Sequence, residues 1–524
     1  MVQFKLKECE YAEQPGFGAA SFFAQLKSGK LAGSAPFFSH QHMNHSSQSD
    51  FIDRRQLSIV LGKDNERAGN PLDHNTTTAI QNDGRFIMTG HQPVIMTGPL
   101  FTFLKAVSVI SLCRKLEKHS KTPLIPGFWI ATEDHDVLEV NRFTINSKQF
   151  VWDYKGKIET NRMPQVGDIN LKDCREPLLK FLSDRLPRND FYEWVLDMVS
   201  SCRFDGYGQM FAGLLLKIFK EWPIVFVDPI ALRPLSAPVL ALLVERWEEL
   251  EEAFEKGKKL VRKHGFVPPL SRINLFEIVN KKRVKCRIQD RALSLSTGDK
   301  SYRSAAVDIR GRPFAFSSGA GLRPLVQDAV LPVMIYVGGS EELLYCWQIA
   351  PLYEAANITS SKRAPRISAT FLESKIIKAA QNCGLYPENV FQARQHLINY
   401  KPDITVLDET NKIDEQAREL LICIENFQTE QNKKWVKKSL YAIRHHIDKL
   451  KSRLADERLF ETGSGRKNLE KVALAVMPSG RLQERVINVF QFLSAYGPDF
   501  VSLCLDTLDP EKLCHLIVEI EPKR

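Results

Sequence analysis

Two of the commonest nucleotide-binding motifs are missing from this chain of 524 residues. A phosphate-binding P-loop needs GxxxxGK followed by serine or threonine, and no stretch supplies it. A dinucleotide-binding turn needs GxGxxG after a strand, but Gly319 and Gly321 are followed by Leu-Arg-Pro. These absences argue against a P-loop ATPase and against a common dinucleotide-binding enzyme.

Recognisable metal motifs are also scarce. The ten cysteines run from Cys9 to Cys514 without a CxxC pair, which excludes a zinc ribbon and a thioredoxin-type site. His40, His42 and His45 lie together, but the surrounding SHQHMNHSSQSD is typical of a polar surface loop. We therefore predict reduced cysteines and assign no metal ligand.

Long apolar runs and targeting signals are missing as well. Uncharged apolar stretches fall short of the roughly 20 residues that a membrane helix needs. The first residues, MVQFKLKECEYAEQ, lack the basic start, apolar middle and cleavage site of a signal peptide. We expect a cytoplasmic protein with no membrane partner.

The charge is unbalanced, with a formal net charge of +10 at pH 7. The basic clusters at residues 256–263, 281–285 and 433–438 are dispersed and lack interleaved aromatic side chains, so solvated helix faces explain them better than nucleic-acid binding. We expect no nucleic-acid partner. A site for acidic small molecules remains compatible with this charge.

Apolar periodicity predicts a doubly wound α/β domain. Residues 85–88 and 123–131 have the composition of buried strands, and the helical spacing of residues 100–119 places a helix between them. Further buried strands are predicted at 224–227 and 332–337. In such domains, ligands bind at the carboxyl ends of the strands.

The domain organisation follows from changes in this pattern. We predict a discontinuous Rossmann-like core over residues 1–400, with an inserted subdomain of short strands at about 266–313. Residues 401–465 carry a heptad pattern typical of an antiparallel helical coiled coil, and 466–524 are expected to return to the core as a helical segment. The first half of the predicted seam consists of Ile413, Ala417, Leu420, Ile424 and Phe427.

The stretch MTGHQPVIMTGPLF (residues 88–101) joins the first strand to its helix. Gly90 and Gly98 allow a ligand to approach the backbone, and the helix starting at Pro99 presents free amides to an anion. His91 can exchange a proton and Gln92 can donate or accept hydrogen bonds. A glycine-shaped structural loop with a satisfied histidine is the alternative.

A run of titratable residues, EDHDVLEVN (residues 133–141), follows the second strand. Crowded like charges raise one another's pKa unless they are solvated, bound to metal or paired with cations. We therefore predict that His135 or a neighbouring carboxylate transfers a proton, or that the group holds a divalent ion. The alternative is an acidic cap on the following turn.

Cationic residues gather around the strand at 332–337, which ends in Gly338 and Gly339. Before it, Arg323 is suited to bidentate binding of a carboxylate, and Gln327 and Asp328 could orient a polar ligand. The alternative is a structural Arg to Asp ion pair. KRAPRIS, after the strand, adds further arginines as anion contacts or as solvated surface.

Five blocks in this order resemble the cysteine-adding enzymes of bacillithiol biosynthesis, a family of cysteine ligases. The similar blocks are TGHQPVIMTGPLFTFLKA (89–106), FWIATEDHDVLEVN (128–141), LRPLVQDAVLPVMIYVGG (322–339), PRISAT (365–370) and LQERVINVFQFLSAYGPDF (482–500). The resemblance implies a Rossmann-type core and a coiled coil that forms a homodimer. It also implies joining the carboxyl of L-cysteine to the amine of glucosaminyl malate.

Amide formation in water is unfavourable, so we expect activation of the carboxylate by ATP with magnesium, or else a carrier or preactivated donor. The residues predicted to act in catalysis are His91, Asp134, His135 and Asp136. Those predicted to bind substrate or nucleotide are Thr89, Gly90, Gln92, Gly98, Glu133, Asn141, Arg323, Gln327, Asp328, Gly338, Gly339 and Arg366. The alternatives are a nucleotidyltransferase or acid-activating ligase of the same fold acting on another small acid, and a coiled-coil scaffold.

Overall fold

The computed structural model describes residues 2–9, 20–31, 51, 53–153, 164–289, 291–399, 404–429, 435–436, 439–444, 446–447 and 464–522. The chain forms two compact units. The core unit comprises Phe17–Ser368 and Ile487–Cys514, and the second unit comprises Met1–Gly16, Ala369–Val486 and His515–Arg524.

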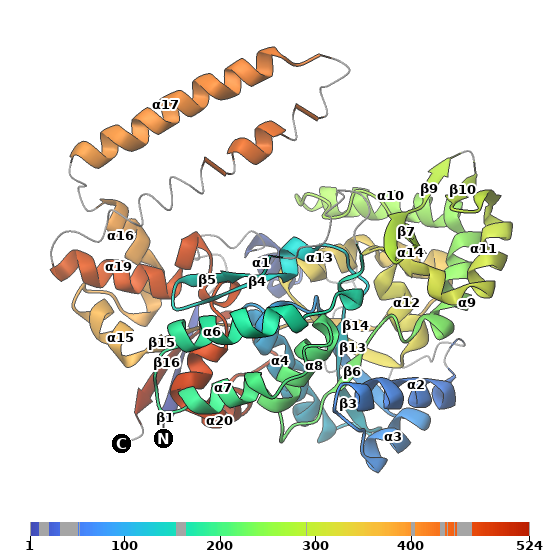
Figure 1. The fold of residues 1–524 in the computed structure, drawn as a ribbon, viewed down its shortest axis with the longest axis horizontal. Coiled ribbons are helices and arrows are strands. Elements are labelled where there is room, and N and C mark those ends of the chain that lie inside the picture. Colours follow the sequence, from blue (N-terminus) through green and yellow to red (C-terminus); the bar gives the residue numbers. More distant parts are fainter. Residues whose placement is uncertain are drawn as a thin grey trace. The chain divides into compact units, whose positions relative to one another are not determined.

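The core unit is built on a five-stranded parallel sheet (Figure 1). Its strands are β2 (Arg85–His91), β3 (Leu124–Ile130), β6 (Val225–Val227), β13 (Val333–Gly338) and β14 (Lys362–Pro365). Their order across the sheet is β14-β13-β2-β3-β6. Numbered by their succession in the chain, the strands run 5-4-1-2-3, which is the Rossmann arrangement read from the other edge. The predicted fold class is confirmed.

Both faces of the sheet are covered because side chains alternate along each strand. On β2, Ile87 packs with Val109 and Leu112 of α4 (Leu100–Glu117). Phe86 and Met88 belong to the core on the opposite face, which also includes side chains of α2 (Arg54–Arg67), α9 (Arg233–Glu245) and α12 (Arg323–Val330). Alternation of this kind makes each strand apolar on both sides, as a doubly wound sheet requires.

The other helices of the core unit connect or flank these layers. They are α1 (Ala20–Lys27), α3 (His74–Gln81), α5 (Val137–Val140), α6 (Arg175–Arg185), α7 (Tyr192–Ser200), α8 (Tyr207–Ile218), α10 (Trp247–Lys263), α13 (Ser340–Gln348), α14 (Ala350–Ala356) and α20 (Phe490–Thr507). Helix α20 packs against α4 and α7. The other parts of the predicted C-terminal segment, 466–486 and 515–522, belong to the second unit. Strands β4 (Arg142–Ile145) and β5 (Lys148–Val151) form a hairpin.

The inserted stretch consists of short antiparallel strands, as the sequence predicts. Its strands are β7 (Leu275–Val279), β8 (Lys282–Lys285), β9 (Arg287–Gln289), β10 (Ala292–Leu295) and β11 (Gly298–Ser301), followed by α11 (Tyr302–Gly311) and β12 (Phe316–Ser318). They pair as β12-β7-β8 and β11-β10-β9. This insertion brings side chains from β8 and β12 to the end of the parallel sheet.

The second unit has its own sheet, in which β1 (Val2–Cys9) and β15 (Ser368–Glu373) flank β16 (His515–Pro522). Its helices are α15 (Ser374–Gln381), α16 (Ala393–Asn399), α17 (Ile404–Asn426) and α19 (Ser464–Val476). The sequence predicts that the core ends at residue 400. The compact units divide at residue 368, because β15 pairs with β16 and not with the parallel sheet.

Helix α17 forms the first half of the expected coiled coil. Ile413, Ala417 and Ile424 are partly buried, but Leu420 and Phe427 are 50% and 71% exposed. The partly buried Leu421, not Leu420, continues the stripe. Most of the predicted second helix, including 448–463, lies outside the described residues, so pairing within or between chains stays a prediction.

None of the helices within these described ranges is long and apolar enough to cross a lipid bilayer.

Candidate functional site at the switch point of the sheet

The predicted glycine motifs meet where the strand order reverses. The chain moves from β2 to β3 on one side, and later crosses to β13 on the other side of β2. β2 ends at Gly90 and His91, and β13 ends at Gly338. Thr89 joins the two strands, because its hydroxyl donates a 2.8 Å hydrogen bond to the Val337 carbonyl. Open α/β sheets bind ligands at such a switch point.

A buried ion pair that the sequence analysis did not predict spans this point. Lys105 of α4 donates to the Gly90 carbonyl at 2.7 Å and pairs with Glu342 of α13 at 2.7 Å. Glu342 also accepts from the Gly339 amide at 2.8 Å and from the Tyr336 hydroxyl at 3.1 Å. Burial alone would raise the pKa of Glu342, but Lys105 lowers it to about 2. Lys105 is the one charged residue in the apolar stretch 100–113, and this was the available signal.

The environment of His91 keeps its imidazole neutral. Burial and the positive charge of Lys105 lower the pKa of His91 to about 4. Its Nδ1 lies 2.9 Å from the Gln92 carbonyl oxygen, which can only accept, so Nδ1 carries the proton. The lone pair is therefore on Nε2, and His91 can accept a hydrogen bond from a ligand.

Two arginines add positive charge near the same strand ends. Arg366 has its guanidinium 5.3 Å from the centre of the Phe101 ring, and its amide donates to the Gly338 carbonyl at 2.9 Å. A methyl group placed on Gly339 would lie 3.7 Å from Arg366 Nε. Arg323, at the start of α12, donates to the Tyr345 hydroxyl at 2.5 Å. With Lys105, these cations make the switch point suitable for an anionic ligand.

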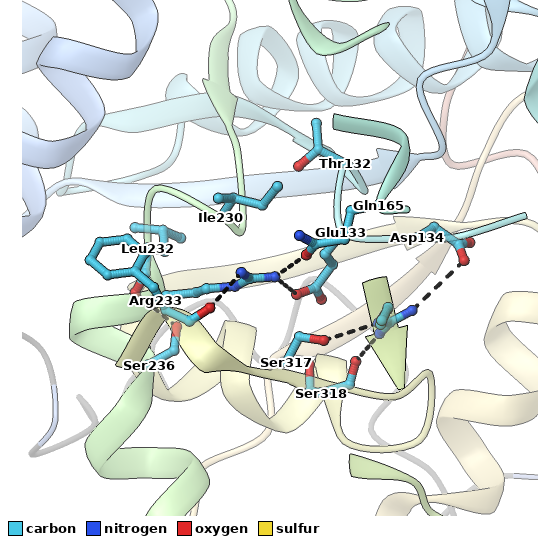
Figure 2. A network of polar contacts seen from close by, with 12 residues as sticks. Thr132, Glu133, Asp134, Gln165, Ile230, Leu232, Arg233, Ser236, Ser317 and Ser318 are labelled. Atoms are coloured by element: carbon cyan, nitrogen blue, oxygen red, sulfur yellow. Dashed lines mark hydrogen bonds and ion pairs between the residues drawn. The ribbon is translucent and has the colours of Figure 1, made fainter. Parts of the chain in front are cut away.

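The end of β3 carries a second buried network (Figure 2). Glu133 is only 6% exposed and lies 3.8 Å from Arg233 of α9. Figure 2 shows Arg233 reaching toward both Glu133 and Gln165, and Arg233 donates to the Gln165 amide oxygen. Burial raises the pKa of Glu133, while nearby arginines, Arg323 among them, oppose the rise. Arg323 lies near enough for its charge to lower the pKa of Glu133, so this network and the switch point interact electrostatically.

Asp134 connects the ends of β2 and β3. It accepts from Gln92 Nε2 at 2.5 Å and from the His135 amide at 2.7 Å. Burial acts to raise the pKa of Asp134, but the hydrogen bonds from His135 and Gln92 outweigh it and hold this pKa well below its usual range. Gln92 also donates to Glu139 at 3.0 Å. The predicted Gln92 and Asp134 are thus linked by a hydrogen bond, and the Asp134 carboxylate is held ionised.

His135 lies next to Asp134, and 39% of its side chain is exposed. Its Nδ1 lies 3.3 Å from Arg283 Nη1 and 3.4 Å from Asp134 Oδ1. Arg283 comes from β8 of the inserted strands and is buried. Asp136 is exposed at the N-cap position of α5, but its side chain makes no capping hydrogen bond. The alternative of an acidic cap is therefore not supported.

A pair of carboxyl groups lies at the end of β6. The Asp228 amide donates to Asp64 of α2 at 3.2 Å, and the Thr132 hydroxyl donates to the Asp228 carboxylate. Burial and mutual repulsion raise the pKa of Asp64 to about 7, and burial raises that of Asp228 to about 6. The sequence places Asp228 after a strand, but nothing in it indicates that Asp64 is its neighbour.

Three predicted binding residues, Asn141, Gln327 and Asp328, are buried within the core unit. Asp328 accepts from Arg363 Nη2 at 2.9 Å, and both side chains are 1% exposed. The alternative of an Arg to Asp ion pair is therefore realised, with Arg363 and not Arg323 as the partner. Gln327, beside it, is completely buried. The Asn141 amide donates to the Trp152 carbonyl at 2.9 Å and holds the β4–β5 hairpin.

Gly98 is needed for a turn. The first backbone amide of the helix that follows already has a hydrogen-bond partner. Gly98 has a φ of +73°, and a Cβ there would lie 2.9 Å from the Val94 Cβ. Its carbonyl accepts from Asn488 Nδ2 at 2.7 Å. The first amide of α4, on Leu100, donates to the Ile487 carbonyl at 2.7 Å. This amide is thus not free for an anion, because residues 487–489 return to this helix end.

The sequence matches two family descriptions that together span most of the chain. Residues 30–367 match "Bacillithiol biosynthesis BshC, N-terminal Rossmann-like domain". Residues 369–520 match "Bacillithiol biosynthesis BshC, C-terminal coiled-coil domain". Their boundary coincides with the division of the compact units at residue 368, while Ile487–Cys514, within the second match, belongs to the core unit.

Similar curated proteins are named "Putative cysteine ligase BshC". The protein of Bacillus cereus is 24% identical over 84% of this chain and 85% of its own length. The protein of Natranaerobius thermophilus is 26% identical over 89% of both chains. A solved structure from Campylobacter jejuni, titled "putative arginyl t-RNA synthetase", shares 9% identity over 87% of this chain and 97% of its own, with a TM-score of 0.21 that supports no conclusion. The relatives' name agrees with the prediction of a ligase, and the two family matches show that this chain belongs to the bacillithiol biosynthesis BshC family.

Proposed function

We propose that the protein is a cysteine ligase that joins the carboxyl group of L-cysteine to the amine of glucosaminyl malate and so forms bacillithiol. One observation carries the proposal: Lys105, Arg323 and Arg366 gather beside neutral His91 at the switch point of the sheet. Membership of the family supports the substrate assignment.

The cationic side chains match the chemistry of the second substrate. Its malate part is a dianion, and guanidinium groups bind carboxylates through charge-assisted hydrogen bonds. Arg323 and Arg366 are the proposed malate contacts. Lys105 already holds Glu342 and the Gly90 carbonyl, so its proposed role is to supply positive charge and to keep His91 neutral.

Amide formation also needs a base, since only a free amine attacks the carboxyl carbon. A base with a pKa far below the working pH removes a proton from an ammonium poorly, which disfavours His91, whose pKa is about 4. Asp134 is disfavoured for the same reason, because its pKa is held low. His135, with 39% of its side chain exposed, is the proposed base.

The cysteine carboxylate must be activated before attack, and we propose ATP as the source of energy. The phosphates of the nucleotide would add negative charge that the same cations can balance. No group of three or more histidine, cysteine or acidic side chains is arranged to hold a metal among the parts of the chain that the structure describes. Magnesium would therefore arrive with the nucleotide.

Mass spectrometry of product formation tests the proposal. We expect bacillithiol from L-cysteine and glucosaminyl malate only with ATP and magnesium. Product without ATP would move the activation step to the donor. No product from folded protein would contradict the proposal, and ATP-dependent pyrophosphate release without the sugar amine would favour a nucleotidyltransferase.

Replacement of the proposed base tests its role separately. His135→Ala should lower kcat by about 100-fold or more, the range over which general bases contribute. His119→Ala is the matched control, because His119 is exposed at the end of α4. Unchanged turnover in folded His135→Ala protein would remove His135 from the mechanism.

We further propose that the chain forms a homodimer through its coiled-coil segment. Leu420 and Ile422 of α17 are each at least half exposed, which leaves apolar surface for a second copy. Light scattering should give twice the chain mass, and a Leu420→Glu/Ile422→Glu variant should be monomeric. A monomeric wild-type protein would contradict this proposal.

A further inference from the structure

His135 has two competing partners at the same nitrogen. Arg283 Nη1 lies 3.3 Å from its Nδ1, and Asp134 Oδ1 lies 3.4 Å from it. A guanidinium can only donate and a carboxylate can only accept. A neutral imidazole can therefore satisfy one of them at a time.

The two choices have opposite consequences for catalysis. If Nδ1 accepts from Arg283, the proton of the neutral ring is on Nε2, which then cannot take up another. If Nδ1 donates to Asp134, Nε2 has the lone pair and can act as a base. The tautomer of His135 thus decides whether the proposed base is competent.

Both competing partners are held in place by other contacts. Arg283 donates through Nε to Ser317 Oγ at 3.0 Å and through Nη2 to the Ser318 carbonyl at 2.6 Å. Its guanidinium also lies 4.0 Å from the centre of the Phe276 ring. Only Nη1 is directed at His135 and Asp134, which are 3.3 Å and 3.8 Å away.

Asp134 is fixed just as firmly. Gln92 holds its Oδ2 at 2.5 Å, and the His135 amide holds its Oδ1 at 2.7 Å. The half-exposed imidazole between these partners can exchange protons with water. The position of its proton is therefore the variable part of the group.

We propose that Arg283 is a positioning residue that keeps His135 in the Nε2–H form until a carboxylate of the second substrate takes the N–H of Nη1. Nδ1 then no longer accepts a hydrogen bond from Arg283 and can instead donate one to Asp134. The ring gives the Nε2 proton to water and receives one at Nδ1, so its charge does not change. This inference rests on the proposed ligase function.

The proton balance of the following step is complete. Nε2 takes one proton from the ammonium of the sugar, and the resulting imidazolium donates its Nδ1–H to ionised Asp134. The free amine then attacks the activated cysteine carboxyl. The C–N bond forms as the bond from the carboxyl carbon to the activating group breaks, that group leaves with the bonding electron pair, and the nitrogen gives its second proton to water. Because the base becomes competent only when the anionic amine substrate is present, water is a poorer competitor for the activated cysteine.

Nitrogen NMR of the free protein tests the inference without any turnover. Protonated and unprotonated ring nitrogens of ¹⁵N-labelled histidine have well-separated shifts, and a His135→Gln spectrum assigns the signal. We expect the Nε2–H form in wild-type protein and the Nδ1–H form in Arg283→Met. Arg287→Met, at an exposed arginine of neighbouring β9, should match wild type.

A conservative variant separates the hydrogen bond from the charge. Arg283→Lys keeps a cation near Glu133 and Asp134 but has no Nη1, so it should also give the Nδ1–H form. It serves as the test if Arg283→Met does not fold. Nδ1–H in free wild-type protein, or Nε2–H retained in a folded Arg283 variant, would overturn the inference.

A ligand titration links the tautomer to the substrate. Glucosaminyl malate should convert wild-type His135 to the Nδ1–H form, and N-acetylglucosamine, which has no carboxylate, should not. Binding of glucosaminyl malate with His135 unchanged would overturn the inference and leave the ligase proposal standing. Failure to bind it at all would contradict the ligase proposal, while the spectra of the free protein still decide what Arg283 does.

Discussion

Replacement of Lys105 by methionine should destabilise the core unit and disturb the proposed site together. The Lys105 side chain is 3% exposed and that of Glu342 is 23% exposed. Removing one partner of a buried ion pair costs about 3–5 kcal/mol, because the other charge is left uncompensated. Glu342 keeps its bonds from Gly339 and Tyr336, so we expect a loss near the lower end of that range.

A double variant identifies the cause of this loss. Glu342→Gln in the Lys105→Met background removes the second charge and retains an oxygen that can accept from Gly339. If the uncompensated carboxylate is responsible, the double variant should be about 2 kcal/mol more stable than Lys105→Met alone. Lys118→Met, at the exposed end of α4, is the matched control.

The pH dependence gives an independent check. Lys105 lowers the pKa of Glu342 to about 2 in the folded protein, against about 4.3 for an unfolded glutamate. The pair therefore stabilises the fold fully above about pH 4.3, and its contribution is lost as the pH falls toward 2. The difference between wild type and Lys105→Met should be largest near pH 7 and shrink below pH 4.

Urea unfolding followed by tryptophan fluorescence measures these differences, since Trp129, Trp247 and Trp347 are buried in the core unit. A Lys105→Met variant within about 0.5 kcal/mol of wild type would refute the reasoning, since surface substitutions commonly fall in that range. So would a double variant less stable than Lys105→Met.

Three further predictions concern groups around the site. Asn488→Ala should cost about 1–3 kcal/mol in urea unfolding, because its Nδ2 holds two carbonyls of the turn before α4 at 2.6 and 2.7 Å, and an unchanged midpoint would contradict this. Asp64→Asn should stabilise the protein at pH 8 more than at pH 5, because the raised pKa values of Asp64 and Asp228, about 7 and 6, make wild-type stability fall as the pH rises through that window; equal effects at both pH values would argue against a repelling pair. Inorganic sulfate, which stays a dianion throughout this range, should raise the pKa of His91 from about 4 when it binds beside it and therefore bind more tightly as the pH falls from 6.5 toward 4, which calorimetry would show, whereas pH-independent binding would place the anion elsewhere.

Local sequence was sufficient for the strand ends of the site. The sequence predicts Gly90, His91 and Gly338 at strand ends because a buried strand has a recognisable apolar run, and the residues after it differ from that run in type. The sequence does not show whether a glycine binds a ligand or only shapes a turn. Gly98 has the same local signature as a ligand-binding glycine, and only its φ of +73° and its contact with Val94 assign it to a turn.

The sequence by itself determined the alternation of strands and helices, the titratable groups after the strands and the resemblance to a family, because each depends on residues that are close together in the chain. Tertiary structure alone decided which groups meet. Arg283 reaches His135 across 148 positions of sequence, and Asp228 meets Asp64 across 164. Burial then determines charge: His91 becomes neutral beside Lys105, and Asp328 joins the core by pairing with Arg363. Desolvation and pairing depend on distances in space, which a local pattern does not contain.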